Sequence, residues 1–278
     1  MTRPLTLGYS PCPNDTFIFH ALVHGLVPLP GFTVSERLED VETLNHLATG
    51  AALDITKVSC HALGHLRKSY CLLRSGGALG RGCGPLVVAT TATTMSALRG
   101  RRIAIPGRLT TANLLLQLFG EGFETVVPMP FDRIMPALAE GVVDAGVIIH
   151  ESRFTYAARG LHAVQDLGAW WEEETGLPIP LGCILARRDL GAATIGNIDA
   201  AIRASLEYAH AHPDAARAYI RAHAQELDAA VTAAHIDLYV NDFSLDLGPE
   251  GEHAIETLLA RAESRGLFTP CNLPLFTP

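Results

Sequence analysis

Short runs of apolar residues alternate with amphipathic stretches along most of the chain. Residues 147–149 form a continuous apolar run, and residues 32–38 alternate between apolar and polar positions. Residues 41–49 have the spacing of a helix and stop at Gly50. Apolar runs bounded by turn residues predict buried strands, and their alternation with helices predicts an α/β fold.

The same patterns predict the strands and helices in the rest of the chain. Residues 161–167 have a mixed pattern that favours neither element. The other predicted strands are 5–9, 53–59, 70–73, 85–89, 102–105, 125–129 and 178–186, and the other predicted helices are 16–27, 60–66, 113–119, 134–140, 198–209, 213–223, 227–239 and 249–265.

The elements group into two α/β units. The chain leaves the first unit at a Thr-rich linker near Thr90 and returns to it near Ile184. This predicts a two-lobed clamshell, in which residues 1–89 and 186–278 form a larger, discontinuous lobe and residues 90–185 form a smaller one. The cleft between the lobes should be lined by strand ends and helix N-termini.

His150 is the first candidate for chemistry in that cleft. It follows the apolar run 147–149, and ligands of open α/β sheets bind beyond the carboxyl ends of strands. The ordinary pKa of histidine, about 6.5, suits a general base near neutral pH. The alternative is a histidine that caps a helix or fills a gap at a strand end.

Two further segments end at the same cleft. Lys57 and Ser59 close a predicted strand and could bind a carboxylate or hydroxyl group, although Lys57 could be a surface residue and Ser59 a helix cap. Thr110 or Thr111 should cap the next helix, and the free amides near Thr111 and Ala112 would form a carboxylate or oxyanion pocket.

The turn of residues 10–15 offers a comparable site. Asn14 or Asp15 can cap the helix that follows, and unpaired amides at a helix N-terminus attract anions. An ordinary capped helix is the alternative. Cys12 lies in this turn, but the sequence places no base beside it.

Composition excludes several classes of partner. The net charge of −8 without basic clusters argues against nucleic acid and anionic membranes as main partners. The glycine-rich residues 74–84 lack the P-loop and dinucleotide fingerprints, so we interpret them as a cleft wall. His210, His212 and His235 are assigned to exposed faces or packing.

The cysteines and the N-terminal sequence indicate the cellular compartment of the protein. None of the six cysteines forms a C-x-x-C pair or a zinc-type run with histidine, which favours a reducing environment and predicts no metal site. The sequence begins directly with a strand pattern instead of a signal peptide, and contains no apolar stretch long enough to cross a bilayer. We therefore expect a cytoplasmic protein.

Several long stretches resemble a known family. They include SPCPNDTFIF at residues 10–19, LEDVETLN at 38–45, RSGGALGRG at 74–82 and IIHESRFTY at 148–156. Residues 166–172 and 177–182 extend the match. Together they resemble the 1,4-dihydroxy-6-naphthoate synthases of the futalosine route to menaquinone, over nearly the whole chain.

The resemblance implies a fold similar to type II periplasmic binding proteins, with the substrate cleft between the lobes. It implies a lyase that converts cyclic dehypoxanthinyl futalosine into 1,4-dihydroxy-6-naphthoate and dihydroxyacetone without a cofactor or an obligate protein partner. The family's base carries over onto His150, and its substrate contacts onto Lys57, Val58 and Ser59 and onto Thr111 and Ala112. The alternatives are the chorismate dehydratase of the same pathway and a non-catalytic binding protein for small solutes.

Overall fold

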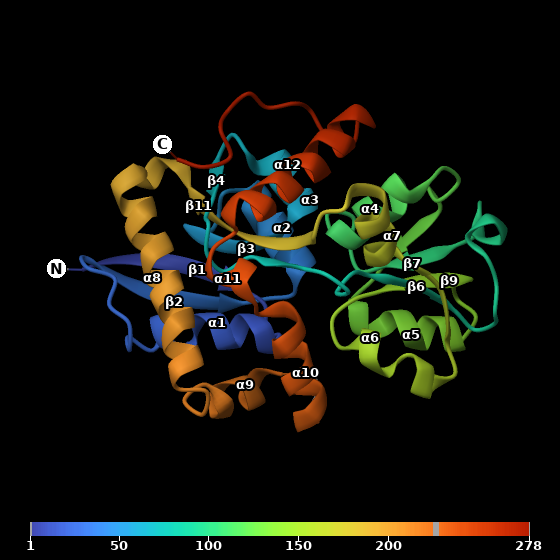
Figure 1. The fold of residues 1–278 in the computed structure, drawn as a ribbon, viewed down its shortest axis with the longest axis horizontal. Helices are drawn as coiled ribbons and strands as arrows, with labels where there is room; N and C mark the ends of the chain where they lie inside the picture. The colour runs from blue at the N-terminus through green and yellow to red at the C-terminus, as the bar shows by residue number, and fades with distance from the viewer. Residues whose placement is uncertain (1, 225–227, 278) are drawn as a thin grey trace.

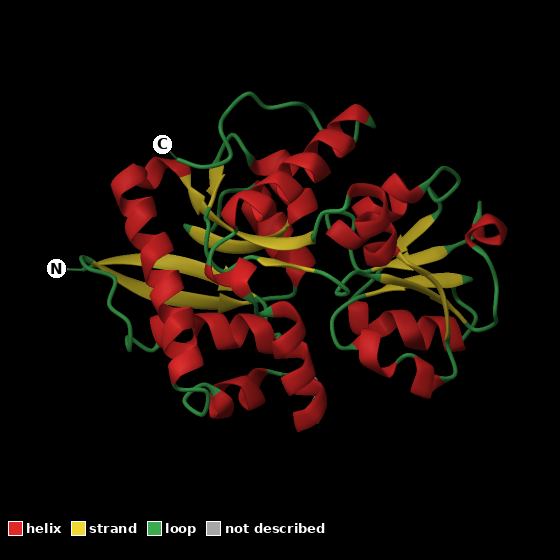
Figure 2. Cartoon of the chain, viewed as in Figure 1, coloured by secondary structure: helices red, strands yellow, loops and turns green. Residues whose placement is uncertain are grey.

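The computed structural model describes residues 2–224 and 228–277, and its strands form two separate sheets (Figures 1 and 2). The first sheet has the order β2-β1-β3-β11-β4, with β5 also paired to β11. Strand β1 runs parallel to β2 and β3, whereas β11 runs antiparallel to its neighbours. The strands are β1 (Arg3–Tyr9), β2 (Phe32–Leu38), β3 (Ile55–Ser59), β4 (Tyr70–Leu72), β5 (Ala78–Gly80) and β11 (Ile179–Arg187).

The second sheet has the order β10-β6-β9-β7-β8. Strand β7 is parallel to β8 and β9, and β6 is antiparallel to β9 and β10. All four residues of β9 are buried, as expected for the run that precedes His150, although this sheet is mixed and not purely parallel. Its strands are β6 (Leu86–Ala89), β7 (Ile103–Ile105), β8 (Val126–Pro128), β9 (Ala145–Ile148) and β10 (His162–Asp166).

Helices cover both sheets and create a lobe around each one (Figure 2). In the first lobe α1 packs against α8, α9 and α10, and α12 packs against α3 and β11; in the second, α4 packs against α7, and α5 against β7 and β9. The helices are α1 (Pro13–Val23), α2 (Val41–Thr49), α3 (Cys60–Leu66), α4 (Thr111–Phe119), α5 (Phe131–Ala139), α6 (Ser152–Thr155), α7 (Leu167–Thr175), α8 (Ala192–Ala211), α9 (Arg217–His223), α10 (Ala229–Tyr239), α11 (Asp242–Leu245) and α12 (Gly248–Ser264), with the short 3₁₀ turns η1 (Met95–Leu98), η2 (Ala157–Arg159) and η3 (Arg188–Leu190). None of the helices in the described residues has the length and apolar character to cross a membrane.

The strand pairing moves both expected lobe boundaries. Residues 86–89 were expected in the larger lobe and residues 179–185 in the smaller one, but β6 pairs within the second sheet and β11 within the first. The sequence of an apolar strand does not indicate which sheet the strand joins, because the pairing is made by backbone hydrogen bonds. We therefore propose to divide the chain near 84/85 and 177/178.

Two segments contain strands that the pattern did not indicate. The mixed residues 161–167 contain β10, whose residues are exposed or half-buried, which explains the weak apolar signal. The glycine-rich loop contains β5. Gly84 in this loop lies so close to Gly168 that a side chain there would overlap the neighbouring backbone, in agreement with the expected close approach.

Candidate functional site

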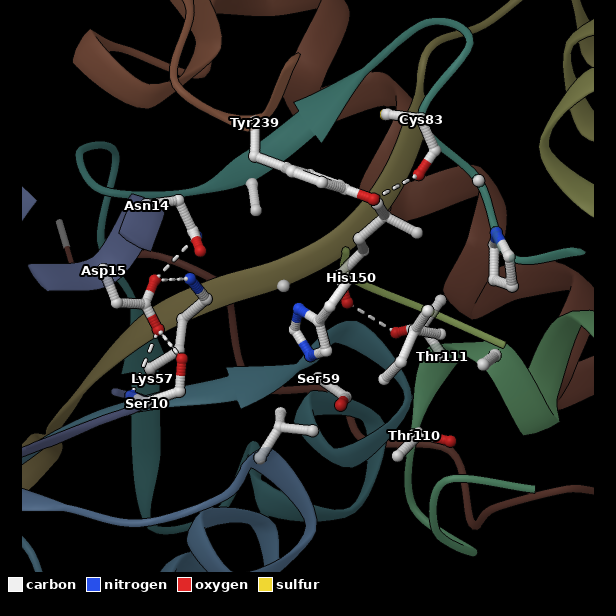
Figure 3. Close-up of a pocket in the computed structure, with 18 residues that line it drawn as sticks. Ser10, Asn14, Asp15, Lys57, Ser59, Cys83, Thr110, Thr111, His150 and Tyr239 are labelled. Atoms are coloured by element: carbon white, nitrogen blue, oxygen red, sulfur yellow. Dashed lines mark hydrogen bonds and ion pairs between the residues drawn. The ribbon is translucent and has the colours of Figure 1, made fainter. Parts of the chain in front are cut away.

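A pocket of roughly 660 Å³, part of it open to solvent, lies between the two lobes (Figure 3). Six of the seven predicted site residues line it: Asn14, Lys57, Ser59, Thr111, Ala112 and His150. Val58 is the exception, because its side chain is fully buried in the apolar core. Alternate residues of a strand point to opposite faces, so Lys57 and Ser59 can face the pocket only if Val58 faces away. A substrate contact at Val58 is therefore left to its backbone, and it stays a prediction.

His150 enters the pocket from the end of β9 with a left-handed backbone. Its φ is +54°, and Ala51 is the only other non-glycine residue with a positive φ in the described part of the chain. Left-handed non-glycine residues are uncommon, and such strain collects at functional sites. Figure 3 shows the imidazole projecting between Asn14, Asp15 and Lys57 on one side and Thr110 and Thr111 on the other.

Asp15 organises the floor of the pocket. Its carboxylate forms a buried ion pair with the Lys57 ammonium and accepts hydrogen bonds from the amide and hydroxyl of Ser10, at 3.1 and 2.7 Å. The expectation that Asn14 or Asp15 caps α1 is wrong, because the helix already begins at Pro13 and Cys12 holds the cap position. The charge of Lys57 is therefore matched by Asp15 before any ligand enters.

Asn14 connects this floor to a histidine that the sequence reading assigned to a surface face or to packing. Its side-chain amide donates to Asp15 Oδ1 at 2.9 Å, and its Oδ1 lies 3.0 Å from Nε2 of His235. His235, on α10, is only 1% exposed, and its ring stacks against that of His150 with the centroids 6.0 Å apart. The only sequence signal was a histidine four residues before Tyr239 on an otherwise apolar helix face.

The N-terminus of α4 forms the opposite wall. The Thr110 side chain caps the helix by accepting from the Asn113 amide at 3.3 Å, as one of the two expected alternatives. The Thr111 hydroxyl donates its hydrogen to the Leu181 carbonyl at 2.6 Å, so this hydrogen is not available to a ligand. The amides of Thr111 and Ala112 belong to the first turn, where no intrahelical acceptor exists, so they remain suited to an anionic group.

Ser59 lies at the carboxyl end of β3 and does not cap α3 with its side chain. Asn45 holds it instead, accepting from the Ser59 amide at 2.9 Å and donating to its hydroxyl oxygen at 3.2 Å. The Ser59 hydroxyl therefore keeps its proton available for a group in the pocket.

A second cavity adjoins the first on another side of His150. Cys12 and Glu151 line it together with His150. The Cys12 sulfur lies 3.8 Å from Nδ1 of His150, and polar atoms of all three side chains lie within 4.8 Å of one another. The sequence showed no partner for Cys12, because Cys12 and His150 meet only when the two lobes come together.

Burial determines the protonation of His150 and Cys12. It lowers the pKa of His150 below its ordinary value, with Lys57 acting in the same direction and the carboxyl groups of Glu151 and Asp15 opposing it. Burial also raises the pKa of the Cys12 thiol well above its usual range. At neutral pH the site therefore contains a neutral imidazole with a free lone pair and a protonated thiol, which is suited to proton abstraction.

Contacts between the lobes hold the pocket closed. The Glu42 carboxylate, on α2 of the first lobe, accepts from the Leu109 amide of the second at 3.0 and 3.2 Å. Gly107 lies against this carboxylate so closely that a Cβ there would overlap it. His61 contributes a contact of 3.2 Å from Nδ1 to the carbonyl of Thr110. The structure thus presents a closed clamshell.

Comparisons with known proteins agree with this architecture. A solved structure of protein AF1704 from Archaeoglobus fulgidus is 40% identical, with a TM-score of 0.89 over 95% of this chain and 98% of that one. The periplasmic aliphatic sulphonate binding protein SsuA from Escherichia coli is 14% identical, with a TM-score of 0.66 over 99% of this chain and 91% of that one. The second likeness confirms the fold similar to periplasmic binding proteins.

Sequence relatives are closer still. A protein of Thermus thermophilus named 1,4-dihydroxy-6-naphtoate synthase is 58% identical over 98% of both chains. A protein of the same name from Streptomyces coelicolor is 49% identical over 95% of this chain and 94% of its own. A family model described as menaquinone biosynthesis matches residues 5–264. The chain therefore belongs to the menaquinone biosynthesis family.

Proposed function

We propose that this chain is a 1,4-dihydroxy-6-naphthoate synthase, a carbon–carbon lyase of menaquinone biosynthesis. It would convert cyclic dehypoxanthinyl futalosine into 1,4-dihydroxy-6-naphthoate and dihydroxyacetone. The observation that carries the proposal is a neutral, strained histidine in an interlobe pocket of a chain 58% identical to a protein of that name.

The pocket suggests how the substrate is held. The amides of Thr111 and Ala112 at the start of α4 are the favoured binding site for the substrate carboxylate, because Asp15 already neutralises Lys57. The hydroxyl of Ser59 would donate to a polar oxygen of the substrate. The apolar part of the wall, which includes Val41, Ala78 and Leu181, would contact the ring system.

His150 would start the reaction by taking the proton of a substrate hydroxyl. The carbon–carbon bond to the three-carbon fragment then breaks, and its electron pair moves into the ring system, where aromatisation favours the products. Such a cleavage needs only proton transfers, so we assign it no metal or organic cofactor. General-base catalysis typically contributes a factor of about a hundred or more.

The decisive experiment offers the purified protein two substrates separately. Cyclic dehypoxanthinyl futalosine should yield dihydroxynaphthoate and dihydroxyacetone, whereas chorismate should remain unchanged. Dehydration of chorismate would replace the proposal with the sibling dehydratase. Binding of the futalosine derivative without any product would instead leave a solute-binding protein.

The same proposal places the enzyme in the cytoplasm. All six cysteines are free thiols and five of them are buried, which favours a reducing compartment. Its partner would be the small carboxylate substrate alone.

A further inference from the structure

Three side chains that commonly bind metal ions converge in the second cavity from different lobes. Cys12 follows β1 in the first lobe, and His150 and Glu151 follow β9 in the second. One ligand atom of each side chain, a sulfur, an imidazole nitrogen or a carboxylate oxygen, lies within 4.8 Å of the other two. In the described residues, this is the one group of at least three histidine, cysteine or acidic side chains with that spacing. The sequence has no metal-binding spacing here, because Cys12 and His150 are 138 positions apart.

The distance between the first two ligand atoms suits a small tetrahedral ion. Cys12 Sγ lies 3.8 Å from Nδ1 of His150. Zinc bonds of about 2.3 Å to sulfur and about 2.0–2.1 Å to nitrogen place such atoms roughly 3.6 Å apart at a tetrahedral angle. The sulfur and the nitrogen are therefore close to the required separation, and the Glu151 carboxylate can approach the ion by rotation of its side chain.

Glu151 has a carboxylate oxygen that the protein does not use. Its Oε2 is buried and accepts no hydrogen bond from any described residue. Nδ1 of His235, which is also buried without a hydrogen-bond partner in this part of the chain, lies 3.9 Å from Oε2, too far for a hydrogen bond. Buried polar atoms normally have a partner, and a bound ion is one group that provides it. A cation beside Glu151 supplies that partner for Oε2.

The cavity is accessible to an ion, and its charge favours a cation. It has a volume of roughly 790 Å³, part of it open to solvent, and all three ligand residues line it. Glu39 and Asp40 line it as well, whereas no lysine or arginine of the described residues does. A surface with acidic groups and no basic ones raises the local concentration of cations.

We propose that Cys12, His150 and Glu151 form an inhibitory zinc site, in which a water molecule from the cavity is the fourth ligand. The donor set selects the metal, because Mg²⁺ and Ca²⁺ prefer oxygen ligands whereas Zn²⁺ binds sulfur, nitrogen and oxygen. The Cys12 thiol releases its proton to solvent when the zinc–sulfur bond forms. The resulting thiolate and the carboxylate together cancel the charge of the ion.

Zinc at this site removes the candidate base. Proton abstraction needs a lone pair on Nε2 of His150, which is present when the hydrogen of the neutral imidazole is on Nδ1. An ion on Nδ1 uses the lone pair of that nitrogen, so the single hydrogen has to be on Nε2. The ion also links the two lobes and so restricts opening of the clamshell. The inhibition, but not the binding of zinc, rests on the proposed lyase function.

Cobalt binding tests the site without reference to activity. Co²⁺ occupies zinc sites, and a thiolate ligand gives it a near-ultraviolet charge-transfer band. The EDTA-treated protein should develop this band with one equivalent of Co²⁺, and Zn²⁺ should abolish the band by displacement. Cys12→Ser should lack the band, whereas Cys271→Ser, at the one cysteine that is not fully buried, should retain it. A wild type without the band, or a band that persists in Cys12→Ser, would overturn the proposal.

Loss of the carboxylate ligand gives a second test. Glu151→Gln should bind Co²⁺ about a hundredfold more weakly, because even outer-shell partners of a metal site contribute about 10–100-fold in affinity. The melting temperature of each variant without metal shows whether it is folded. Equal affinity of Glu151→Gln and the wild type would remove Glu151 from the site.

Turnover separates the zinc site from the proposed function. An excess of Zn²⁺ should stop conversion of cyclic dehypoxanthinyl futalosine by the wild type and by Cys271→Ser, and EDTA should restore it. Relative to its own zinc-free rate, Glu151→Gln should need about a hundredfold more Zn²⁺ for half inhibition. Full turnover with the metal bound would refute the inhibition. Cobalt binding by a protein that converts no substrate would refute the lyase function and leave the metal site standing.

Discussion

The sulfur of Cys12 lies 3.8 Å from Nδ1 of His150, although the two residues are 138 positions apart. Cys12 belongs to the loop after β1 in one lobe, and His150 to the loop after β9 in the other. When Nδ1–H donates to this sulfur, Nε2 keeps the lone pair that a base requires. Because the contact forms between the two lobes, the orientation of the His150 imidazole depends on closure of the lobes.

This geometry makes Cys12 an orienting group and not a nucleophile. Because burial keeps its thiol protonated, alkylation by iodoacetamide at neutral pH should be slow. Cys12→Ala should lower kcat up to about tenfold, the effect of one weak hydrogen bond, while Cys12→Ser should retain most activity. Loss of all activity in the serine variant would show that the thiol takes a direct part in the chemistry.

Removal of the imidazole tests the candidate base. His150→Asn suits the left-handed backbone, because asparagine tolerates positive φ better than most residues. We expect turnover to fall about a hundredfold or more, while the melting temperature stays within a few degrees of the wild type. Product formation by steady-state kinetics and thermal unfolding by circular dichroism provide the two measurements; wild-type turnover would remove His150 from its role.

The Asp15–Lys57 pair should be essential for stability as well as for the pocket. Both side chains are buried, so Asp15→Asn leaves an unpaired ammonium in the interior and should cost about 3–5 kcal/mol of unfolding free energy. The double variant Asp15→Asn, Lys57→Met removes the orphaned charge and should recover part of this loss. Urea unfolding of the single and double variants measures the coupling, and additive losses would contradict a direct interaction.

Glu42 should control closure of the clamshell. Glu42→Gln removes the charge from the hydrogen bonds to the Leu109 amide, so the closed state loses about 1–2 kcal/mol. We expect KM to rise by about tenfold with a smaller change in kcat, and the radius of gyration in solution scattering to increase. Glu121→Gln, at an exposed position of the second lobe, should change neither quantity. An unchanged KM in Glu42→Gln would show that closure does not depend on this contact.

His61 predicts a loss of stability in mild acid. Burial lowers its pKa to about 4, whereas the unfolded chain has the ordinary value near 6.5. The unfolded state therefore binds more protons between these values, and stability falls as the pH drops from about 6.5 to about 4, by roughly 3 kcal/mol in total. Urea unfolding at pH 7 and pH 4.5 should reveal this loss, and His61→Asn should reduce it. The same pH dependence in wild type and variant would assign the effect to other groups.

Local pattern was sufficient for much of the fold and for the position of the site. Residues 32–38, 41–49 and 60–66 form the elements that the sequence predicted, because their local patterns and the turn or cap residues around them are characteristic of a strand and of helices. The ends of β3 and β9 and the start of α4 placed Lys57, Ser59, Thr111 and His150 at the pocket, since strand ends and helix N-termini are recognisable one segment at a time.

Only the tertiary structure decided which segments meet. The sheet that receives β6, the ion pair between Asp15 and Lys57, and the approach of Cys12 to His150 and Glu151 all join residues far apart in the chain. The sequence of α10 indicates only an exposed or packing role for His235, whereas in the structure α10 packs against α1 and Nε2 of His235 lies 3.0 Å from Oδ1 of Asn14. Periodicity records which face of a segment is buried, but it does not record what that face touches, and protonation depends on those contacts.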